Sequence, residues 1–513
     1  MCFFLKKRLI LIFFFCLIPF LQVITLDLES YEPINYQLYS SNQVLTPTFY
    51  PPLTKDIPLS ASFNASDYIG LDQNVWDNTF TGRNITVAIL DTGIYANHSV
   101  FTNDGTLNWS NRIIAFYDAI ANYTTVPFDD HGHGTWAASI LGGKSSEYHG
   151  VATNVSFVIL KIFDNSGETN SSMLLRAVNW ILSNKNTYNI RIVSMSFGAK
   201  PEVNNLGDIS KIQDIVAELV DEGILVVAAA GNDGDPTKSY GDGTINAPAS
   251  ERKVLAVGGV DYFGNMYPNS AKGPSIDGAI KPDVCAPAIS IYGANKNYNT
   301  DYSFRSGTSG ATPFVAGLAA LMLEKNPRLD PLQLKSIISL TSIRTINPLN
   351  IKDNIQGWGI IQGYAALDAL NNPIMLNITS NFLVNLNQTK SVFCLPIQLR
   401  PNHYFFEIEK ISDISAEMYL FNNKPDSYGE PILLTSTVNL LVGNVPQKRM
   451  GILVDKVSDF YLVVKLTQGT NGEFLIRMVF EYRNLVIVIF GLINIITLIY
   501  VLNLSRNFKK SYM

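Results

Sequence analysis

The feature that most constrains the fold of this chain is a series of short apolar runs that alternate with amphipathic segments. The runs occupy residues 85–90, 157–162, 190–196, 224–230 and 254–260, and the segments of helical periodicity between them occupy residues 135–141, 171–183 and 209–222. Strands that are apolar throughout are typical of a parallel sheet covered on both faces. The alternation therefore predicts an α/β fold, a parallel sheet flanked by helices.

Polar residues follow two of these apolar runs directly. Asp91 follows the first run, in ITVAILD, and Asn232 follows the fourth, in ILVVAAAGN. In open parallel sheets, ligands bind beyond the carboxyl ends of the strands. We therefore expect a functional site at this edge of the sheet.

Three residue types needed for nucleophilic catalysis occur in short motifs. Asp91 lies in Asp-Thr-Gly, His133 in His-Gly-Thr, and Ser309 in Gly-Thr-Ser-Gly-Ala-Thr-Pro. A serine hydroxyl becomes a good nucleophile when a neutral histidine takes its proton, and a buried carboxylate orients that histidine. Each motif alone is more typical of a turn, a helix cap or a loop. Together, in this order, they predict catalysis.

With Asn232 in Gly-Asn, this motif set resembles the signatures of the subtilisin-like serine proteases (subtilases), over about residues 65–372. The resemblance implies a subtilisin-like α/β domain with Ser309 as nucleophile, His133 as base and then acid, and Asp91 as the orienting carboxylate. It also implies an oxyanion hole made by the Asn232 side chain and the Ser309 backbone N–H. The implied activity is hydrolysis of protein peptide bonds through an acyl-enzyme intermediate.

The resemblance further implies where a peptide substrate binds. An extended peptide adds as a strand beside one segment of the enzyme, and a second segment near residues 166–168 lies on the other side of the peptide. The primary side chain, that of the residue whose carbonyl is attacked, enters a pocket floored by small residues. The residues expected to contact substrate are Ser196, Phe197 and Gly198 on the strand side and Ala229, Ala230 and Gly231 in the pocket.

Some positions depart from the family pattern or suggest metal binding. Trp136 stands where the pattern after His-Gly-Thr continues apolar-Ala-Gly, and we expect its bulk to alter helix packing. His131 and His133 form a His-x-His pair, but no third ligand is near in sequence, so we expect no metal site. The loop after Leu141 lacks the oxygen ligands of the family's tight calcium site. We therefore expect no cofactor for the chemistry and leave structural calcium open.

Both ends of the chain carry long apolar stretches with adjacent basic residues. Residues 9–26 follow Lys6, Lys7 and Arg8, which is typical of a signal peptide or an uncleaved signal anchor. Residues 485–504 are long enough to span a bilayer, and the basic residues after them indicate a cytoplasmic C-terminus. We therefore expect a single-pass protein of the cell surface or endomembranes, with its catalytic domain extracellular or lumenal.

Between the catalytic domain and the predicted span, aromatic and β-branched runs predict a β-rich, sandwich-like domain, with a hairpin loop at TQGTNG, residues 467–472. Cys285 and Cys394 are expected to be separate buried thiols rather than a disulfide. The predicted organisation is 1–26 signal peptide or anchor, 27–64 short N-terminal extension, 65–372 catalytic domain, 373–482 β-rich domain, 485–504 transmembrane helix and 505–513 cytoplasmic tail.

Composition narrows the possible partners. Hydrophobic residues make up 47% of the 513 residues, and 38 basic against 43 acidic residues give a net charge of −5. The chain is therefore not disordered, and it has no basic footprint for nucleic acid. Two hypotheses remain: a membrane-anchored serine endopeptidase acting on proteins or peptides, and a catalytically silent subtilase fold used for binding or adhesion.

Overall fold

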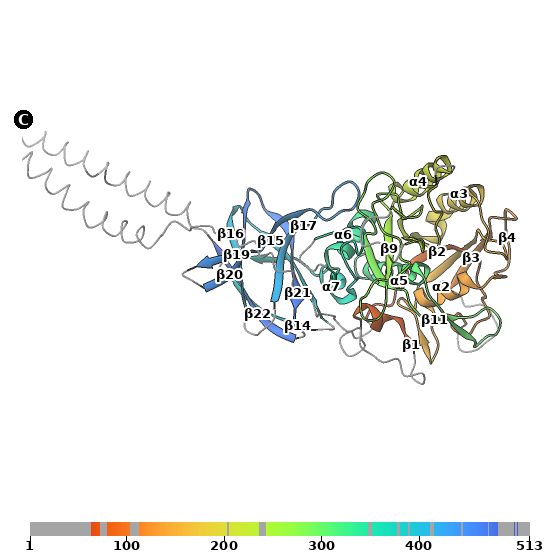
Figure 1. Cartoon of the computed structure of the whole chain (residues 1–513), viewed down its shortest axis with the longest axis horizontal. Helices are drawn as coiled ribbons and strands as arrows, with labels where there is room; N and C mark the ends of the chain where they lie inside the picture. Colours follow the sequence, from red (N-terminus) through yellow and green to blue (C-terminus); the bar gives the residue numbers. More distant parts are fainter. Residues whose placement is uncertain are drawn as a thin grey trace, which may run out of the picture.

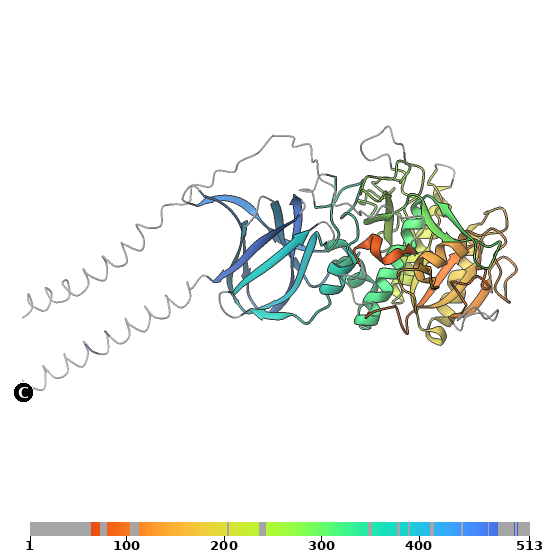
Figure 2. The same ribbon diagram turned by 90° about the horizontal axis from the view of Figure 1, so that it is seen from below.

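The computed structural model describes residues 63–71, 79–102, 112–202, 205–234, 243–346, 351–376, 380–387, 390–410, 415–442, 445–469 and 471–480, with positions 497 and 500. These residues form two units, an α/β unit and a C-terminal β unit. The two units lie end to end in both perpendicular views (Figures 1 and 2).

An eight-stranded sheet forms the centre of the α/β unit, in the order β10-β9-β8-β7-β2-β6-β3-β4. Its strands are β2 (Thr86–Asp91), β3 (Ile113–Asp118), β4 (Tyr123–Thr124), β6 (Ser156–Lys161), β7 (Ile190–Met195), β8 (Leu225–Ala229), β9 (Leu255–Val260) and β10 (Val284–Pro287). Neighbouring strands are parallel except for the β3–β4 pair at one edge. Every residue of β2, β8 and β9 is buried, which confirms the predicted parallel sheet covered on both faces.

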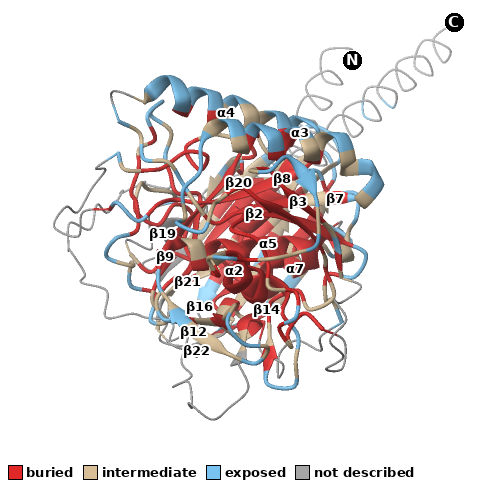
Figure 3. Ribbon diagram, turned by 90° about the vertical axis from the view of Figure 1, so that its right-hand side faces the viewer, coloured by how far each residue is buried: buried red, intermediate tan, exposed pale blue. Residues whose placement is uncertain are grey.

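Helices cover both faces of this sheet. They are η1 (Ala65–Ile69), α2 (His133–Gly142), α3 (Ser171–Tyr188), α4 (Leu206–Asp221), α5 (Thr308–Lys325), α6 (Pro331–Leu340) and α7 (Gly363–Asp368). Val87 and Ile89 of β2 belong to the apolar core that contains α2 and α5, whereas Ala88 and Leu90 belong to the core that contains α3 and α4. Figure 3 shows α2 and α5 almost entirely buried, with α3 and α4 exposing their outer faces.

The predicted helical segments are confirmed, with longer bounds. The segment predicted at 171–183 is α3, which extends to Tyr188. Asn170 caps its start by accepting hydrogen bonds from the backbone N–H groups of Ser172 and Met173, and Asn189 ends it in the left-handed conformation. The segment predicted at 135–141 is α2, which begins two residues earlier, at His133 itself.

Two small sheets complete the α/β unit. The strand β1 (Phe63–Asn64) pairs in parallel with β5 (Tyr148–His149), and β11 (Ile291–Ala294) pairs with β12 (Tyr302–Arg305) as an antiparallel hairpin. This β11–β12 hairpin packs against α2, and the chain leaves β12 almost directly into α5. The hairpin therefore lies next to the starts of two helices that carry motif residues.

The C-terminal unit contains two five-stranded sheets, in the orders β13-β15-β21-β17-β18 and β14-β22-β16-β20-β19. Its strands are β13 (Ile374–Leu376), β14 (Ser380–Asn387), β15 (Val392–Leu399), β16 (Asn402–Lys410), β17 (Ser415–Asn422), β18 (Leu433–Ser436), β19 (Val438–Val442), β20 (Val445–Val454), β21 (Ser458–Gln468) and β22 (Asn471–Phe480). Buried residues from both sheets belong to one apolar core, as expected for the predicted sandwich-like domain.

The predicted hairpin at residues 467–472 is wrong. The strands on either side of this segment, β21 and β22, belong to different sheets. Each of them already pairs with a partner on both edges, β21 with β15 and β17, and β22 with β14 and β16. The short connection therefore crosses from one sheet to the other, because neither strand has a free edge to offer its sequence neighbour.

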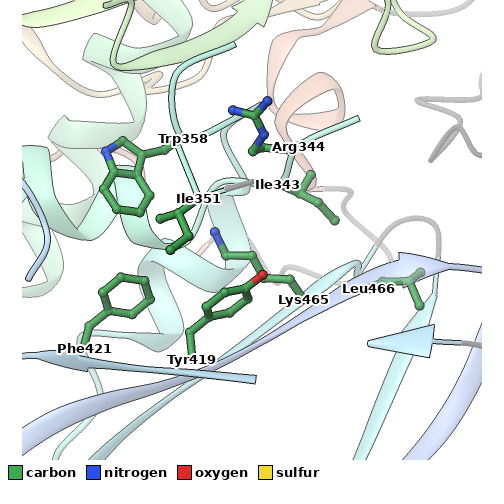
Figure 4. Close-up of a pocket in the computed structure, with 8 residues that line it drawn as sticks. All are labelled: Ile343, Arg344, Ile351, Trp358, Tyr419, Phe421, Lys465 and Leu466. Atoms are coloured by element: carbon green, nitrogen blue, oxygen red, sulfur yellow. The ribbon is translucent and has the colours of Figure 1, made fainter. Parts of the chain in front are cut away.

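The two units share a tightly packed interface. The backbone N–H of Val392 donates to the hydroxyl of Tyr364 at 2.6 Å, and Lys465 Nζ donates to the Ser342 carbonyl at 2.6 Å. The apolar core of the sandwich is continuous with the core around α5. Figure 4 shows a pocket at this interface, lined by Ile343, Arg344, Ile351 and Trp358 of the α/β unit and by Tyr419, Phe421, Lys465 and Leu466 of the β unit.

Several predictions about the chain ends concern residues without a described structure. The apolar stretch 9–26 lies outside the described residues, and so does the stretch 485–504 apart from positions 497 and 500. Among the residues that are described, no helix combines the length and apolar character needed to cross a bilayer. Cys285 and Cys394 are buried free thiols, as predicted.

Candidate active site

Asp91 and His133, which are far apart in sequence, meet at the carboxyl edge of the sheet. Asp91 is the last residue of β2 and His133 the first of α2. The Nδ1 atom of His133 lies 2.8 Å from Oδ1 and 3.0 Å from Oδ2 of Asp91. Because an ionised carboxylate only accepts hydrogen bonds, Nδ1 carries the proton and Nε2 is left as the basic nitrogen.

The two partners differ in exposure. The Asp91 side chain is 1% exposed and that of His133 is 22% exposed. Burial, the largest single influence, lowers the pKa of His133, but the charge and hydrogen bond of Asp91 together raise it further. The pKa of His133 therefore lies above its ordinary value of 6.5, and the nearby cation Arg305 reduces this upward shift.

A second buried carboxylate, Asp129, holds the turn that leads into α2. Its Oδ1 accepts hydrogen bonds from the Gly132 N–H at 2.6 Å and the Thr92 hydroxyl at 2.9 Å. Its Oδ2 accepts from the N–H and hydroxyl of Thr135 at 3.0 and 2.5 Å. The Thr92 hydroxyl in turn accepts from the Gly134 N–H at 2.9 Å. Asp129 thereby ties the end of β2 to the start of α2.

The sequence analysis missed Asp129. Burial raises its pKa, but the four hydrogen bonds together lower it further, so that the pKa lies below its ordinary value and the group stays charged. Its position in Asp-Asp-His-Gly-His, four residues before His133, was the available signal. The sequence alone did not distinguish it from Asp130, whose Oδ1 instead forms an ion pair with Nζ of the buried Lys161, 2.6 Å away.

Asn232 lies against the start of α5, where Ser309 is the second residue. The Oδ1 atom of Asn232 accepts hydrogen bonds from the Thr308 N–H at 2.9 Å and from the Thr308 hydroxyl at 3.2 Å. The Thr308 hydroxyl also accepts from the Gly231 N–H at 3.2 Å. Because the oxygen of the amide is occupied, its Nδ2 group is the part available to donate beside Ser309.

Trp136 connects the helices that carry His133 and Ser309. Its indole Nε1 donates to the Ile291 carbonyl at 3.1 Å. A Cβ atom added to Gly310 would lie 2.8 Å from Trp136 Cη2, and one added to Gly293 would lie 2.3 Å from Cδ1. The ring of Trp136 also lies 5.7 Å from that of His133. The expected change in packing is therefore accommodated by two glycines that leave room for the indole.

The predicted substrate segment follows β7. The Ser196 hydroxyl is buried and has no hydrogen-bond partner within the described residues. Phe197 packs edge-on against Phe163, with ring centroids 5.1 Å apart, and Gly198 is exposed. In the described part of the chain, the backbone groups of Phe197 and Gly198 form no hydrogen bond, although Ala199 pairs with a neighbouring segment.

The predicted pocket floor lies at the end of β8. Ala229 and Ala230 are fully or almost fully buried, and Gly231 has a φ of +116°. A Cβ atom on Gly231 or on Gly198 would lie 2.6 Å from side-chain atoms of Asn246. Asn246, which the sequence analysis also missed, therefore packs against both predicted substrate segments, at Gly198 and at Gly231.

Among the residues that the structure describes, no three His, Cys, Asp or Glu side chains cluster as metal ligands. The ring of His131 lies 6.4 Å from that of His133. Its Nε2 lies 3.4 Å from the position that a Cβ atom on Gly167 would take, in the segment predicted to lie on the other side of the peptide. His131 is thus placed at the rim of the site.

Comparisons with known proteins show which family this chain resembles. Residues 82–359 match the family model described as the subtilase family, Peptidase_S8. The serine protease AprX of Bacillus subtilis (strain 168) is 31% identical over 290 residues, which cover 51% of this chain and 61% of AprX. Subtilisin DY of Bacillus licheniformis is 32% identical over 290 residues, which cover 56% of this chain and 92% of that protein.

A solved structure of a cold-adapted subtilisin-like serine proteinase covers 55% of this chain and 90% of its own chain, at 27% identity and a TM-score of 0.44. The match spans only part of some relatives, 61% of AprX and 39% of the minor extracellular protease Epr of Bacillus subtilis (strain 168).

Proposed function

This chain belongs to the subtilase family, and we propose that it is a serine endopeptidase that hydrolyses peptide bonds in proteins. The observation that carries the proposal is the hydrogen bond from His133 Nδ1 to the buried Asp91, 2.8 Å long, at the carboxyl edge of the parallel sheet. This bond leaves Nε2 as the basic nitrogen of His133, and α2, which carries His133, packs against α5, which carries Ser309. The proposed chemistry requires no cofactor.

In the proposed reaction, Ser309 Oγ attacks the carbonyl carbon of the scissile bond while His133 Nε2 takes the hydroxyl proton. Asp91 stabilises the imidazolium that forms. His133 then donates this proton to the leaving amine, which departs and leaves an acyl group on Ser309. Water, deprotonated by the same nitrogen, hydrolyses the acyl-enzyme. The raised pKa of His133 suits a group that must accept and then release a proton near neutral pH.

Asn232 Nδ2 and the Ser309 backbone N–H are the proposed donors to the oxyanion. The hydrogen bonds that Asn232 Oδ1 accepts from Thr308 support this role, because they leave Nδ2 as the group that can donate. We expect Asn232→Ala to slow turnover by about 10²–10³, a magnitude taken from the equivalent loss in subtilisin. The folded state should be little affected. Near-wild-type turnover of the variant would exclude the role.

A peptide substrate is proposed to add as a strand beside Ser196, Phe197 and Gly198. The unpaired backbone groups of Phe197 and Gly198, seen among the described residues, support this mode. The residues proposed to floor the primary pocket are Ala229, Ala230 and Gly231. Their small side chains leave room for a substrate side chain without selecting its type.

Labelling with a fluorophosphonate tests the proposed activity directly. The full chain should incorporate the probe at Ser309, and Ser309→Ala should not. Cleavage of a peptide library, with the same variant as control, then defines the preferred sequence. Folded protein that neither labels nor cleaves would instead favour a catalytically silent subtilase fold that acts in binding or adhesion.

We also propose that the protein is anchored in a membrane, with its catalytic domain extracellular or lumenal. The apolar stretch 485–504 and the basic residues that follow it support this orientation. In sealed vesicles from an expressing cell, a tag at the C-terminus should be digested by protease added from the cytoplasmic side, whereas the catalytic domain should be protected. Extraction of the chain by alkaline carbonate would contradict the anchor.

A further inference from the structure

Two cations of the β11–β12 hairpin lie against the residue that precedes the catalytic histidine. A Cβ atom added to Gly132 would lie 3.1 Å from Cγ of Lys296 and 3.4 Å from Nη2 of Arg305. The Arg305 guanidinium also lies over the ring of Trp136, 5.9 Å from its centroid. Because Gly132 is followed by His133, this pair of residues, Arg305 and Lys296, borders the site. We call the pair the hairpin cations.

The hairpin cations have no carboxylate partner within the described part of the chain. The Arg305 guanidinium forms no hydrogen bond or ion pair there, and Lys296 Nζ donates only to the backbone carbonyl of Asp130. The nearby carboxylates have their direct partners elsewhere: Asp91 in His133, Asp129 in the turn before α2, and Asp130 in a buried lysine. Burial lowers the pKa of Arg305 by more than the charges of Asp129 and Asp91 raise it, so this partly buried cation with no directly bonded anion is suited to an anionic ligand.

The substrate segments define one side of Ser309. Gly198 and Gly231 both lie against Asn246, and the Gly231 N–H donates to the hydroxyl of Thr308, the residue before Ser309 in the chain. Because the primary side chain belongs to the residue whose carbonyl is attacked, the proposed binding mode puts the acyl half of the peptide, the half that stays on the serine, on this side.

The hairpin cations lie on the other side. Gly310, which follows Ser309, packs against Trp136, and Trp136 packs in turn against Arg305. The ring of His133, which gives its proton to the leaving amine, lies 5.7 Å from that of Trp136. A leaving half that extends away from the substrate segments would pass over Trp136 and meet Arg305.

We propose that Arg305, assisted by Lys296, forms a subsite for a carboxylate on the leaving half of the substrate. The enzyme then favours Asp or Glu directly after the scissile bond. This inference rests on the proposed endopeptidase function. The same carboxylate chemistry could come from the free C-terminus of a short leaving fragment, and the test separates the two sources.

The test uses fluorogenic peptides that share one acyl half, chosen from a cleavage library, and carry Glu, Gln or Lys after the scissile bond. The full chain should cleave the Glu peptide about tenfold faster than the Gln peptide in kcat/KM, the order expected for one charge-assisted hydrogen bond. The Lys peptide should be slowest. The preference should weaken at high salt, because the subsite is partly exposed.

Variants of the hairpin cations test whether these residues cause the faster cleavage of the Glu peptide. Arg305→Gln should abolish most of the Glu preference, Arg305→Lys should retain part of it, and Lys296→Gln should reduce it less. Lys211→Gln removes a cation from the exposed surface of α4 and serves as the matched control. If the Glu peptide is still cleaved faster than the Gln peptide when both have amidated C-termini, the group that binds Arg305 is the side-chain carboxylate. If faster cleavage is seen only for peptides whose single leaving residue ends in a free carboxylate, the group is the C-terminal carboxylate.

Two results would overturn the inference while leaving the proposed function intact: equal, Ser309-dependent cleavage of the three peptides, or an unchanged Glu preference in Arg305→Gln. Absence of any Ser309-dependent cleavage would instead contradict the proposed function and the inference with it.

A pH profile adds an independent readout, because Arg305 lowers the pKa of His133. Arg305→Gln should therefore move the acid limb of kcat/KM for the Gln peptide to higher pH, and Lys211→Gln should not.

Discussion

Glu430 of the C-terminal unit supplies the second negative charge in a cluster of buried lysines that belongs to the α/β unit. It lies 2.8 Å from Lys352 and 3.3 Å from Lys335. The same lysines lie 3.0 and 3.5 Å from Asp283, which also pairs with Lys281 at 2.7 Å. Without Glu430, three lysines would face one carboxylate.

Glu430→Gln removes this charge and changes little else. The amide oxygen can still accept the hydrogen bond that the indole Nε1 of Trp358 donates to Glu430 at 2.9 Å. Removing one partner of a buried ion pair costs about 3–5 kcal/mol, and because Glu430 is 26% exposed we expect about 3 kcal/mol. For a chain of this size, that corresponds to a decrease in Tm of about 3 °C.

The destabilisation should depend on pH. Burial lowers the pKa of Lys352, but Asp283 and Glu430 together raise it further, above its ordinary value of 10.5. A group with a raised pKa stabilises the fold below its unfolded pKa and loses this effect as pH rises through the folded value. The difference between wild type and Glu430→Gln should therefore be constant near pH 7 and shrink above about pH 10.5.

The assay is thermal unfolding of the full chain, followed by tryptophan fluorescence. Glu218→Gln, at an exposed carboxylate on α4, is the matched control and should unfold with wild type. A double-mutant cycle with Lys352→Met isolates the pair. A Tm for Glu430→Gln equal to that of the control would refute the role of Glu430 in joining the two units.

Three further predictions concern the site. The kcat/KM for a neutral peptide should rise with pH with an inflection above 6.5, because His133 has a raised pKa and must be neutral to act as base; an inflection below 6.5 would contradict the Asp91–His133 pairing. Asp129→Asn should reduce kcat/KM by up to about 100-fold, since its donors hold the start of α2 and a displacement of about 1 Å costs that much. It should also lower the pKa of His133, so its pH profile must move to lower pH rather than only lose amplitude. Gly310→Ala should lower the free energy of unfolding by about 1–3 kcal/mol in denaturant titrations, because its Cβ would lie 2.8 Å from Trp136; Trp136→Phe should relieve part of this loss, and an unchanged midpoint would show that the indole can move.

Much of the site was predictable because its residues lie in short local motifs at the ends of regular elements. Asp91 was placed at a strand end by the apolar run before it, and His133 and Ser309 at helix starts by the apolar residues that follow them. Asp129 was not predictable, because its hydrogen bonds join residues from β2 and from α2. Asn246 was missed for the same reason: it contacts glycines that follow two separate strands.

The error at residues 467–472 has a comparable origin. Turn residues between two β-rich runs predict a hairpin when only the local sequence is considered. Whether the two strands pair depends on which edges other strands have already taken, and β21 and β22 have none free. Local turn chemistry therefore fixed the position of the connection but not its direction.

The amino-acid sequence by itself determined the class of fold, the chain order of the candidate catalytic residues and the two kinds of domain, because apolar periodicity and short motifs are local properties. Only the tertiary structure decided which charges face one another. The approach of the hairpin cations to Gly132 and the contact of Glu430 with Lys335 and Lys352 each join segments distant in sequence. Electrostatic interactions depend on distance and burial, and no local pattern in the chain encodes either.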